Sequence, residues 1–523
     1  MDSFCGKLLT SLLILPFTAG NYRRRLKGSW YYDCMISSRV LFLIVLAIMI
    51  VFTASKNVQT HTEIRLGFVL ILLSLLMIFA VIGFSILGCL VHKHGYQYIV
   101  AARRNASTPK LQVLFLWMFG LGSVFYCAFF VGKQIECSEN TTSGYLWYIL
   151  LYFNVILILC LISQMVALTY FSPYELTQTH LVDFTMSMLL VANVCMYVYG
   201  TLMGDTSLYI IYIYPDSDLA NCLEQNSTIS LLLEKAKPIL KPNFTEFCLM
   251  SCTILLEIWS PTRVQVPNEE TPYVAISDIQ DSERSPLLPN VTEIEHRPFR
   301  NRGRRTACQM ITLVFSIPTG LGFIVCYIVM AMGLGNMENM RYVSEIYEQA
   351  VKVIAVLAIF IGFFCLVQYC TPDSSSKGLK SREYVYLLSA FGLFMSHISK
   401  GIGGDVSSER YSYLLLITSV IGIFEDYLQV VFLLYANRCK KSDPQSNIDL
   451  LESVLIILMI SNFIFWLNDT FLLSEFPITR ILEHDDIPPE TLSIVYNVLL
   501  PMSVFFRFFS FLEYYATFGK FNA

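Results

Sequence analysis

The stretch LGFVLILLSLLMIFAVIGFSILGCLV at residues 66–91 decides the fold class, because it is long, apolar and free of charged side chains. About 20 consecutive apolar residues in a helix cross the hydrocarbon core of a bilayer. Similar stretches recur along the 523-residue chain, which is 55% hydrophobic and 15% charged, whereas an average soluble protein has about 25% charged residues. The sequence therefore predicts an all-α polytopic membrane protein and excludes an ordinary soluble enzyme.

Twelve stretches are predicted to be transmembrane helices, with the N-terminus in the cytoplasm. Most of the 36 Lys and Arg residues then fall on cytoplasmic segments, as the positive-inside rule requires. The predicted spans are residues 37–54, 66–91, 111–132, 145–170, 182–203, 244–259, 309–334, 346–370, 384–400, 412–436, 449–467 and 491–516.

A polar segment at residues 261–308 divides these spans into six and six. It is rich in Pro, Glu, Asp, Ser and Arg, a composition typical of a disordered cytoplasmic linker. Three short matches occur in the same order on both sides of it. They are Phe119-Gly120-Leu121 with Phe391-Gly392-Leu393, Gln164 with Gln429, and Asn193 with Asn462. We therefore predict two pseudo-repeated six-helix halves, related by an axis along the membrane normal.

The two halves and the linker define the predicted domain boundaries. These are a cytoplasmic N-terminal segment at 1–36, a first half at 37–260, the linker at 261–308, a second half at 309–519 and a cytoplasmic tail at 520–523.

Glycosylation sequons give a second indication of the orientation. Asn140 and Asn226 fall on outside loops, where an Asn-x-Ser/Thr acceptor is accessible, and we predict that both are glycosylated. Asn105 and Asn290 match the same pattern on the cytoplasmic side, and we interpret them as chance matches.

Two further features lie outside the spans. Cys137 and Cys222 fall on outside loops and are candidates for a disulfide. Glu283, Leu287 and Leu288 in the linker match an acidic-dileucine sorting signal, ExxxLL, which predicts traffic to an endolysosomal membrane.

Polar side chains inside predicted spans are the candidate functional residues, because they are costly in hydrocarbon. Four are amides repeated between the halves, Gln164, Asn193, Gln429 and Asn462. Amides donate and accept hydrogen bonds, so they can order a file of water or close it by bonding one another. The alternative is that they only stabilise contacts between helices.

Charged side chains form a second group of candidates. Glu425 lies four residues before Gln429 and on the same helical face, so it could relay protons. The alternative is that Glu425 and Asp426 neutralise Lys352 or Arg507.

The remaining titratable candidates have simpler interpretations. Glu246 is expected at the outer start of its span, and Glu257 at the inner end of the same span, where interfacial water would solvate it. His397 is the one histidine of seven within a predicted span, and we interpret it as a hydrogen-bonded structural group.

The sequence also excludes several functional classes. It contains no nucleophile elbow, phosphate-binding loop, HExxH motif or CxxC pair, so we predict no enzymatic activity, metal site or cofactor. The net charge of −4 gives no basic field for nucleic acid.

Several of these segments resemble the otopetrin family. NFIFWL at 462–467 and PMSVFFRFFSFLEYY at 501–515 are similar to its last two spans. FGLGSVFY at 119–126, the Gln164 segment, VANVCMY at 191–197 and EFCLMSCTILLEIW at 246–259 are similar to its spans 3 to 6. The resemblance implies a homodimeric, proton-selective channel of twelve spans in two barrel-like domains, with cytoplasmic termini. It implies functional roles for Gln164, Asn193, Glu246, Gln429, Asn462 and Arg507.

The chain departs from the family pattern at several positions. Met188 and Phe509 stand where the family commonly has histidine, and Phe247 stands where it has tyrosine. An acid of the family aligns with Gly204, although Asp205 is adjacent. Because two imidazoles are absent, gating by pH near neutrality is in question.

The sequence thus predicts a proton channel in the plasma membrane, whose partners are protons, lipid and a second copy of the chain. A secondary active transporter is the first alternative, because six-plus-six architecture is common among transporters. It would require broken helices, for which Pro318 and Gly320 give the one hint. A membrane-embedded acyltransferase is the second alternative, and it would require a water-accessible partner for His397.

Overall fold

The computed structural model describes eleven long stretches of the chain, two short ones and some single residues. They are residues 34–54, 62–102, 108–136, 145–176, 179–202, 228–259, 337–372, 381–406, 409–442, 449–471 and 489–522, together with 22–24 and 30–32, residues 19 and 379, and single residues between 310 and 325.

Eleven long helices occupy most of these residues. They are α3 (Met35–Ala54), α4 (Thr62–Tyr98), α5 (Thr108–Glu136), α6 (Tyr145–Phe171), α7 (His180–Leu202), α10 (Thr228–Ile258), α12 (Met337–Tyr369), α13 (Ser381–Val406), α14 (Glu409–Arg438), α15 (Asp449–Phe471) and α17 (Pro489–Asn522). Each overlaps one predicted span, whereas the span predicted at 309–334 falls on a region where only single helical residues are described.

Eight of the described helices are long and apolar enough to cross a membrane. They are α3, α4, α5, α6, α7, α12, α14 and α15, and the bent α10 would be a ninth. The outward face of α12 exposes Leu357, Phe360, Phe364 and Val367, as expected for side chains that contact lipid. These features confirm an all-α, multi-pass membrane protein.

Helix α10 differs from its prediction. It begins at Thr228, well before the predicted start at 244, and it bends by 56° between Thr228–Lys237 and Leu240–Ile258. The break contains Pro238, and proline removes a backbone donor from the helix interior. Glu246 therefore lies within α10 rather than at its start.

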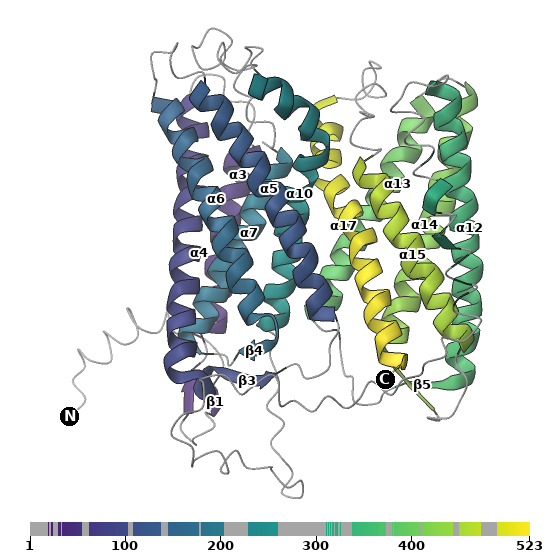
Figure 1. Ribbon diagram of the computed structural model, residues 1–523, viewed down its shortest axis with the longest axis horizontal. Coiled ribbons are helices and arrows are strands. Elements are labelled where there is room, and N and C mark those ends of the chain that lie inside the picture. Colours follow the sequence, from purple (N-terminus) through teal and green to yellow (C-terminus); the bar gives the residue numbers. More distant parts are fainter. Residues whose placement is uncertain are drawn as a thin grey trace, which may run out of the picture.

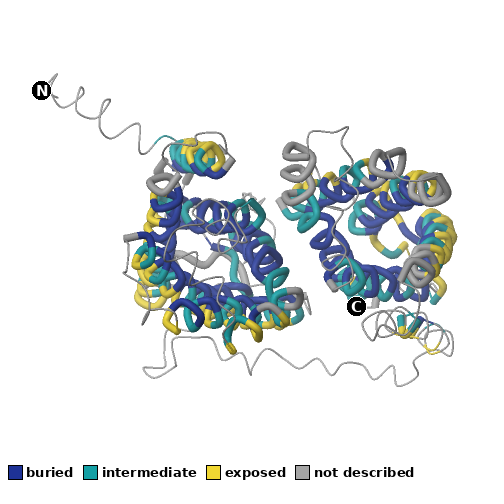
Figure 2. The backbone as a smooth tube through the Cα atoms, turned by 90° about the horizontal axis from the view of Figure 1, so that it is seen from above, coloured by how far each residue is buried: buried dark blue, intermediate teal, exposed yellow. Residues whose placement is uncertain are grey.

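The helices gather into two bundles, which Figure 1 shows side by side and Figure 2 shows as two rings. In the first bundle α5 packs on α6 and α10, α4 packs on α6 and α7, and α7 packs on α10. In the second bundle α13 packs on α14 and α17, α12 packs on α14 and α15, and α15 packs on α17. The helix contacts of the two bundles thus follow the same order.

Short strands continue some of these helices at one end of the bundles (Figure 1). Strand β3 (Ile99–Ala102) follows α4 and pairs with β4 (Tyr174–Leu176), which follows α6. Strand β5 (Cys370–Pro372) follows α12 and pairs with β6 (Cys439–Lys441), which follows α14. A third antiparallel pair joins β1 (Tyr22–Arg24) to β2 (Trp30–Tyr32). The all-helical prediction missed these strands.

Aromatic rings fill much of the contact between the bundles. Phe115 and Phe119 of α5 meet Phe508 of α17 with ring centroids 4.7 and 5.1 Å apart. Trp466 of α15 lies 5.3 Å from Phe508 and 6.0 Å from Phe119. Edge-on ring contacts of this kind add to the burial of apolar surface, so they stabilise the contact between the bundles.

The two repeated glycines have a packing role. A Cβ atom on Gly120 of α5 would collide with the end of the Met165 side chain. A Cβ atom on Gly392 of α13 would lie 2.5 Å from the Cβ atom of Met502 on α17 and 3.4 Å from the carbonyl oxygen of Leu499. Both glycines therefore permit close helix contacts, as small residues do between membrane helices.

Candidate functional site

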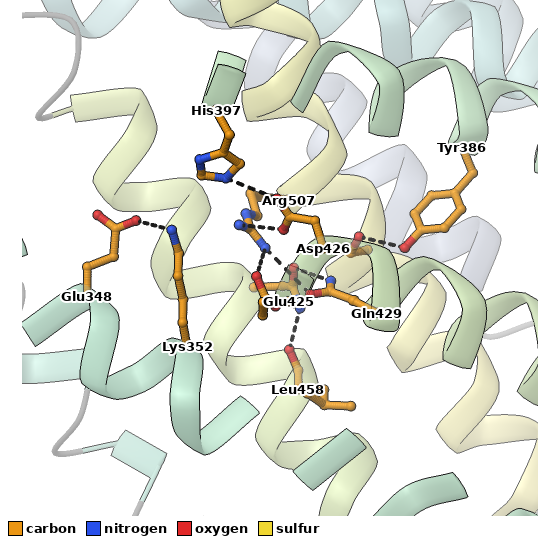
Figure 3. A network of polar contacts seen from close by, with 11 residues as sticks. Glu348, Lys352, Tyr386, His397, Glu425, Asp426, Gln429, Leu458 and Arg507 are labelled. Carbon is orange, nitrogen blue, oxygen red and sulfur yellow. Dashed lines mark hydrogen bonds and ion pairs between the residues drawn. The ribbon is translucent and has the colours of Figure 1, made fainter. Parts of the chain in front are cut away.

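A buried ion-pair network lies in the second bundle (Figure 3). Arg507 of α17 contacts two carboxylates of α14, with Nη2 2.8 Å from Asp426 Oδ1 and Nη1 3.3 Å from Glu425 Oε2. All three residues are at most 2% exposed. The alternative that Glu425 and Asp426 pair with Arg507 is therefore confirmed. Lys352 instead pairs with Glu348 of its own helix, at 2.7 Å.

An amide pair extends this network. Gln429 Nε2 donates to Asn462 Oδ1 at 2.7 Å, and Asn462 Nδ2 donates to the carbonyl oxygen of Leu458 at 2.8 Å. Arg507 Nη1 also donates to Gln429 Oε1, at 3.5 Å. The network thus joins α14, α15 and α17 and brings Glu425, Gln429 and Asn462 together.

The first bundle contains the matching amide pair. Gln164 Nε2 of α6 donates to Asn193 Oδ1 of α7 at 2.8 Å, and Asn193 Nδ2 donates to the carbonyl oxygen of Leu189 at 2.8 Å. In both bundles the asparagine bonds back one helical turn, and this leaves its side-chain oxygen as the acceptor for the glutamine. The amides bond one another in both places, an arrangement that fits both a closed water file and a contact that stabilises the helices.

The surroundings of the two amide pairs differ. Four residues before the glutamine, α6 has the buried thiol of Cys160 where α14 has Glu425. The next residue is Leu161 in α6 and Asp426 in α14. The second bundle therefore places titratable groups beside its amides, whereas the first places a thiol and a hydrocarbon side chain there.

His397 of α13 extends the charged network further. Its Nε2 atom lies 3.0 Å from Asp426 Oδ2, and the residue is 5% exposed. A Cβ atom on Gly422 of α14 would lie 2.6 Å from Cε1 of the ring, so the glycine leaves the space that the imidazole fills. His397 thus contacts an ionisable group of the network.

Glu246 lies where the two bundles meet. Its Oε1 atom accepts a hydrogen bond from Trp466 Nε1 at 2.8 Å, and the residue is 3% exposed. Oε2 has no hydrogen-bond partner among the described residues. Glu246 is therefore a contact between the bundles and lies apart from the Arg507 network.

A second network between the bundles was missed from the sequence. Arg382 of α13 pairs with Glu257 of α10 at 3.0 Å and with Glu513 of α17. Gln112 of α5 donates to Glu257 at 3.3 Å, and Asn437 of α14 donates to Glu513 at 3.2 Å. Glu257 is 6% exposed, so the expectation that water solvates it is wrong. No sequence pattern marked Arg382, because its partners come from the other bundle and from a distant helix.

The two positions that lack the family histidine are apolar. Phe509 is fully buried, with its ring centroid 5.5 Å from that of Phe505 and 5.4 Å from Cζ of Arg382. Met188 is half-buried on α7 and packs against the core of the bundle. Neither position can titrate near neutral pH.

Several predicted sites lie outside the described residues. They are Asn140, Asn226, Cys137, Cys222, Glu283, Leu287, Leu288 and the linker at 261–308. Within the described part of the chain, no group of three or more His, Cys, Asp or Glu side chains could hold a metal ion.

The family follows from a comparison of sequences. The sequence model of the otopetrin family matches residues 212–508, more than half of the chain. The chain belongs to the otopetrin family. The otopetrin match includes the Arg507 network and Glu246, whereas Gln164 and Asn193 precede it. No curated protein matches the chain. Otopetrins form a membrane ion-transport family rather than an enzyme family, so the chain is assigned to ion transport.

Proposed function

We propose that the protein is a proton-selective channel, which lets protons cross the membrane passively down their electrochemical gradient. The observation that carries the proposal is the continuous set of polar contacts from His397 through Asp426, Arg507 and Gln429 to Asn462. A proton can hop along hydrogen-bonded groups and water, so it requires no wide pore. A larger cation would require coordinating oxygens in place of its hydration shell, and the guanidinium of Arg507 would repel it.

The proposal includes twelve spans arranged as two pseudo-repeated halves, 37–260 and 309–519, with cytoplasmic termini and the linker between them. Three observations support the duplication. The helix contacts follow the same order in both bundles, the strand pairs β3–β4 and β5–β6 follow corresponding helices, and both amide pairs have the same geometry. By the family resemblance, we further propose a homodimer in the plasma membrane, with an endolysosomal membrane as the alternative.

The function is tested with Gln429→Leu and Glu425→Gln. Leucine keeps approximate size but removes the donor and acceptor, and glutamine keeps shape but cannot titrate. We expect both variants to reach the cell surface and to lose most of the current evoked by external acid. Whole-cell current, with its reversal potential followed against the proton gradient, is the measurement.

The matched control is Gln164→Leu, which removes the amide pair of the first bundle and no charge. An additive loss from Gln164→Leu and Gln429→Leu would indicate two parallel paths. Normal current from well-expressed Gln429→Leu would show that the second bundle does not conduct. If the reversal potential of the wild type does not change with the proton gradient, the protein is not a proton channel.

A secondary transporter is the second candidate, and the bend in α10 favours it, because transporters bind substrates at broken helices. A transporter would couple the proton to a second solute. The reversal potential would then depend on the concentration of that solute, whereas the channel would follow protons alone.

The proposed orientation predicts where glycans attach. Asn140→Gln and Asn226→Gln should each remove one glycan, seen as a mobility shift that glycosidase abolishes in the wild type. Asn105→Gln and Asn290→Gln should leave the mobility unchanged, and protease outside intact cells should spare the 261–308 linker. A glycan on Asn290 would reverse the orientation.

A further inference from the structure

The charges in the Arg507 network do not balance. Glu425 and Asp426 contribute two negative charges when ionised, and Arg507 contributes one positive charge. His397, the fourth member in contact, is neutral without an added proton. One negative charge is then left over in a place that water hardly reaches, because all four residues are at most 5% exposed. Unpaired charge is unfavourable there, so the cluster should bind one proton.

We propose that this cluster is a proton-binding site and that His397 receives the proton, which sets the external pH at which the path conducts. The inference rests on the proposed channel function. It also assigns a role to a histidine other than the two family positions that are Met188 and Phe509 here.

The position of His397 favours it as the receiving group. It lies towards the C-terminal end of α13, which faces outwards in the proposed orientation. Figure 3 shows it at one end of the network, with Leu458 at the opposite end. Imidazole is also the side chain whose unperturbed titration lies between pH 5 and 8.

Protonation would change the contacts in a defined order. The proton adds to the His397 ring nitrogen that carries no hydrogen. The contact from Nε2 to Asp426 Oδ2 then becomes a charge-assisted hydrogen bond. Asp426 then has two cationic partners, His397 and Arg507. Arg507 has alternative acceptors in Glu425, at 3.3 Å, and Gln429, at 3.5 Å. We expect the guanidinium to move towards them and to admit water beside Asp426.

Other charged groups near the site are already accounted for. Glu348 of α12 is paired with Lys352, which also acts electrostatically on Glu425, and this pair adds no net charge. Asp469 of α15 and Glu348 both act electrostatically on Arg507, and each acts more weakly than Asp426 and Glu425. The Tyr386 hydroxyl of α13 bonds to Ser510. None of these removes the excess negative charge of the contact cluster.

The test is the dependence of current on external pH for wild type, His397→Gln and Gly422→Ala. Glutamine retains a donor for Asp426 but cannot titrate. We expect its activation curve to shift to the acid side by about one pH unit or more, because the cluster then has no imidazole to bind the proton. Each activation curve is normalised to its own maximal current, and the level of the variant at the cell surface should stay near wild type.

Gly422→Ala tests the same site without changing the histidine. Its Cβ atom would displace the ring from Asp426, so its curve should shift in the same direction. Gly401→Ala on α13 is the matched control, because its Cβ atom would meet Ser419 at an ordinary 3.5 Å, and its curve should not shift.

Two outcomes distinguish this inference from the proposed function. If the wild type carries no acid-evoked proton current, the channel proposal fails. If the wild type conducts and His397→Gln has the wild-type activation curve, the channel proposal stands and the role of His397 is wrong. For a variant retained inside cells, the same curve is measured as proton flux into liposomes containing the purified protein.

Discussion

Arg507→Met should strongly destabilise the protein and leave little of it at the cell surface. The substitution keeps a long apolar stem but removes the guanidinium, so Glu425 and Asp426 lose the cation that both contact. Removing one partner of a buried ion pair typically costs about 3–5 kcal/mol, because the other charge remains buried without compensation. The measurement is the fraction of detergent-solubilised protein that stays monodisperse after heating, compared with wild type.

Two further variants separate charge from packing. Glu425→Gln and Asp426→Asn added to Arg507→Met should restore most of the lost stability, because a neutral buried cluster carries no uncompensated charge. Arg438→Met is the matched control, since Arg438 is 33% exposed in its pair with Glu383 and such pairs contribute about 0–1 kcal/mol. If Arg507→Met proves as stable as wild type, the network does not hold the second bundle together.

Gly392→Ala is expected to have the second-largest effect on stability. The new methyl group would lie 2.5 Å from the Cβ atom of Met502 and 3.4 Å from a backbone carbonyl oxygen. Neither atom can move by changing a side-chain rotamer, so α13 and α17 would have to separate. Overpacking of this kind costs about 1–3 kcal/mol, and the same heating assay in detergent measures it.

Two other glycines are matched controls for Gly392→Ala. Gly120→Ala meets the flexible end of Met165, so the side chain can move and the loss should be smaller. Gly401→Ala makes an ordinary contact at 3.5 Å and should be neutral or stabilising, because alanine favours a helix by up to about 1 kcal/mol over glycine. Equal losses at all three positions would mean that the close approach at Gly392 is unimportant.

The sequence predicted those features that depend on local patterns. Long apolar runs marked the positions of the helices, because bilayer thickness imposes a minimum length. The predicted helix did not include the first part of α10, because Lys235, Lys237 and Pro238 interrupt the apolar pattern there. The prediction also missed the paired strands, because segments of three or four residues are too short to show a periodicity.

Part of the candidate site was also predicted from local sequence patterns. Helical spacing placed Glu425 and Gln429 on one face, and the repeat related Asn462 to Asn193, so their grouping was foreseen. The contacts of His397 with Asp426 and of Arg382 with Glu257 and Glu513 join residues far apart in sequence. Such contacts depend on how the helices pack, which hydropathy does not specify.

The strand pairs at one end of the bundles have a mechanical consequence. The ladders β3–β4 and β5–β6 tie α4 to α6 and α12 to α14 through backbone hydrogen bonds, and no strand pair joins the opposite ends of these helices in the described part of the chain. Each helix pair is therefore stiffer at the tied end, and fluctuations in its spacing grow with distance from the ladder. In the proposed orientation the more compliant end faces outwards, so hydration of the second bundle should begin near His397 and advance towards Asn462.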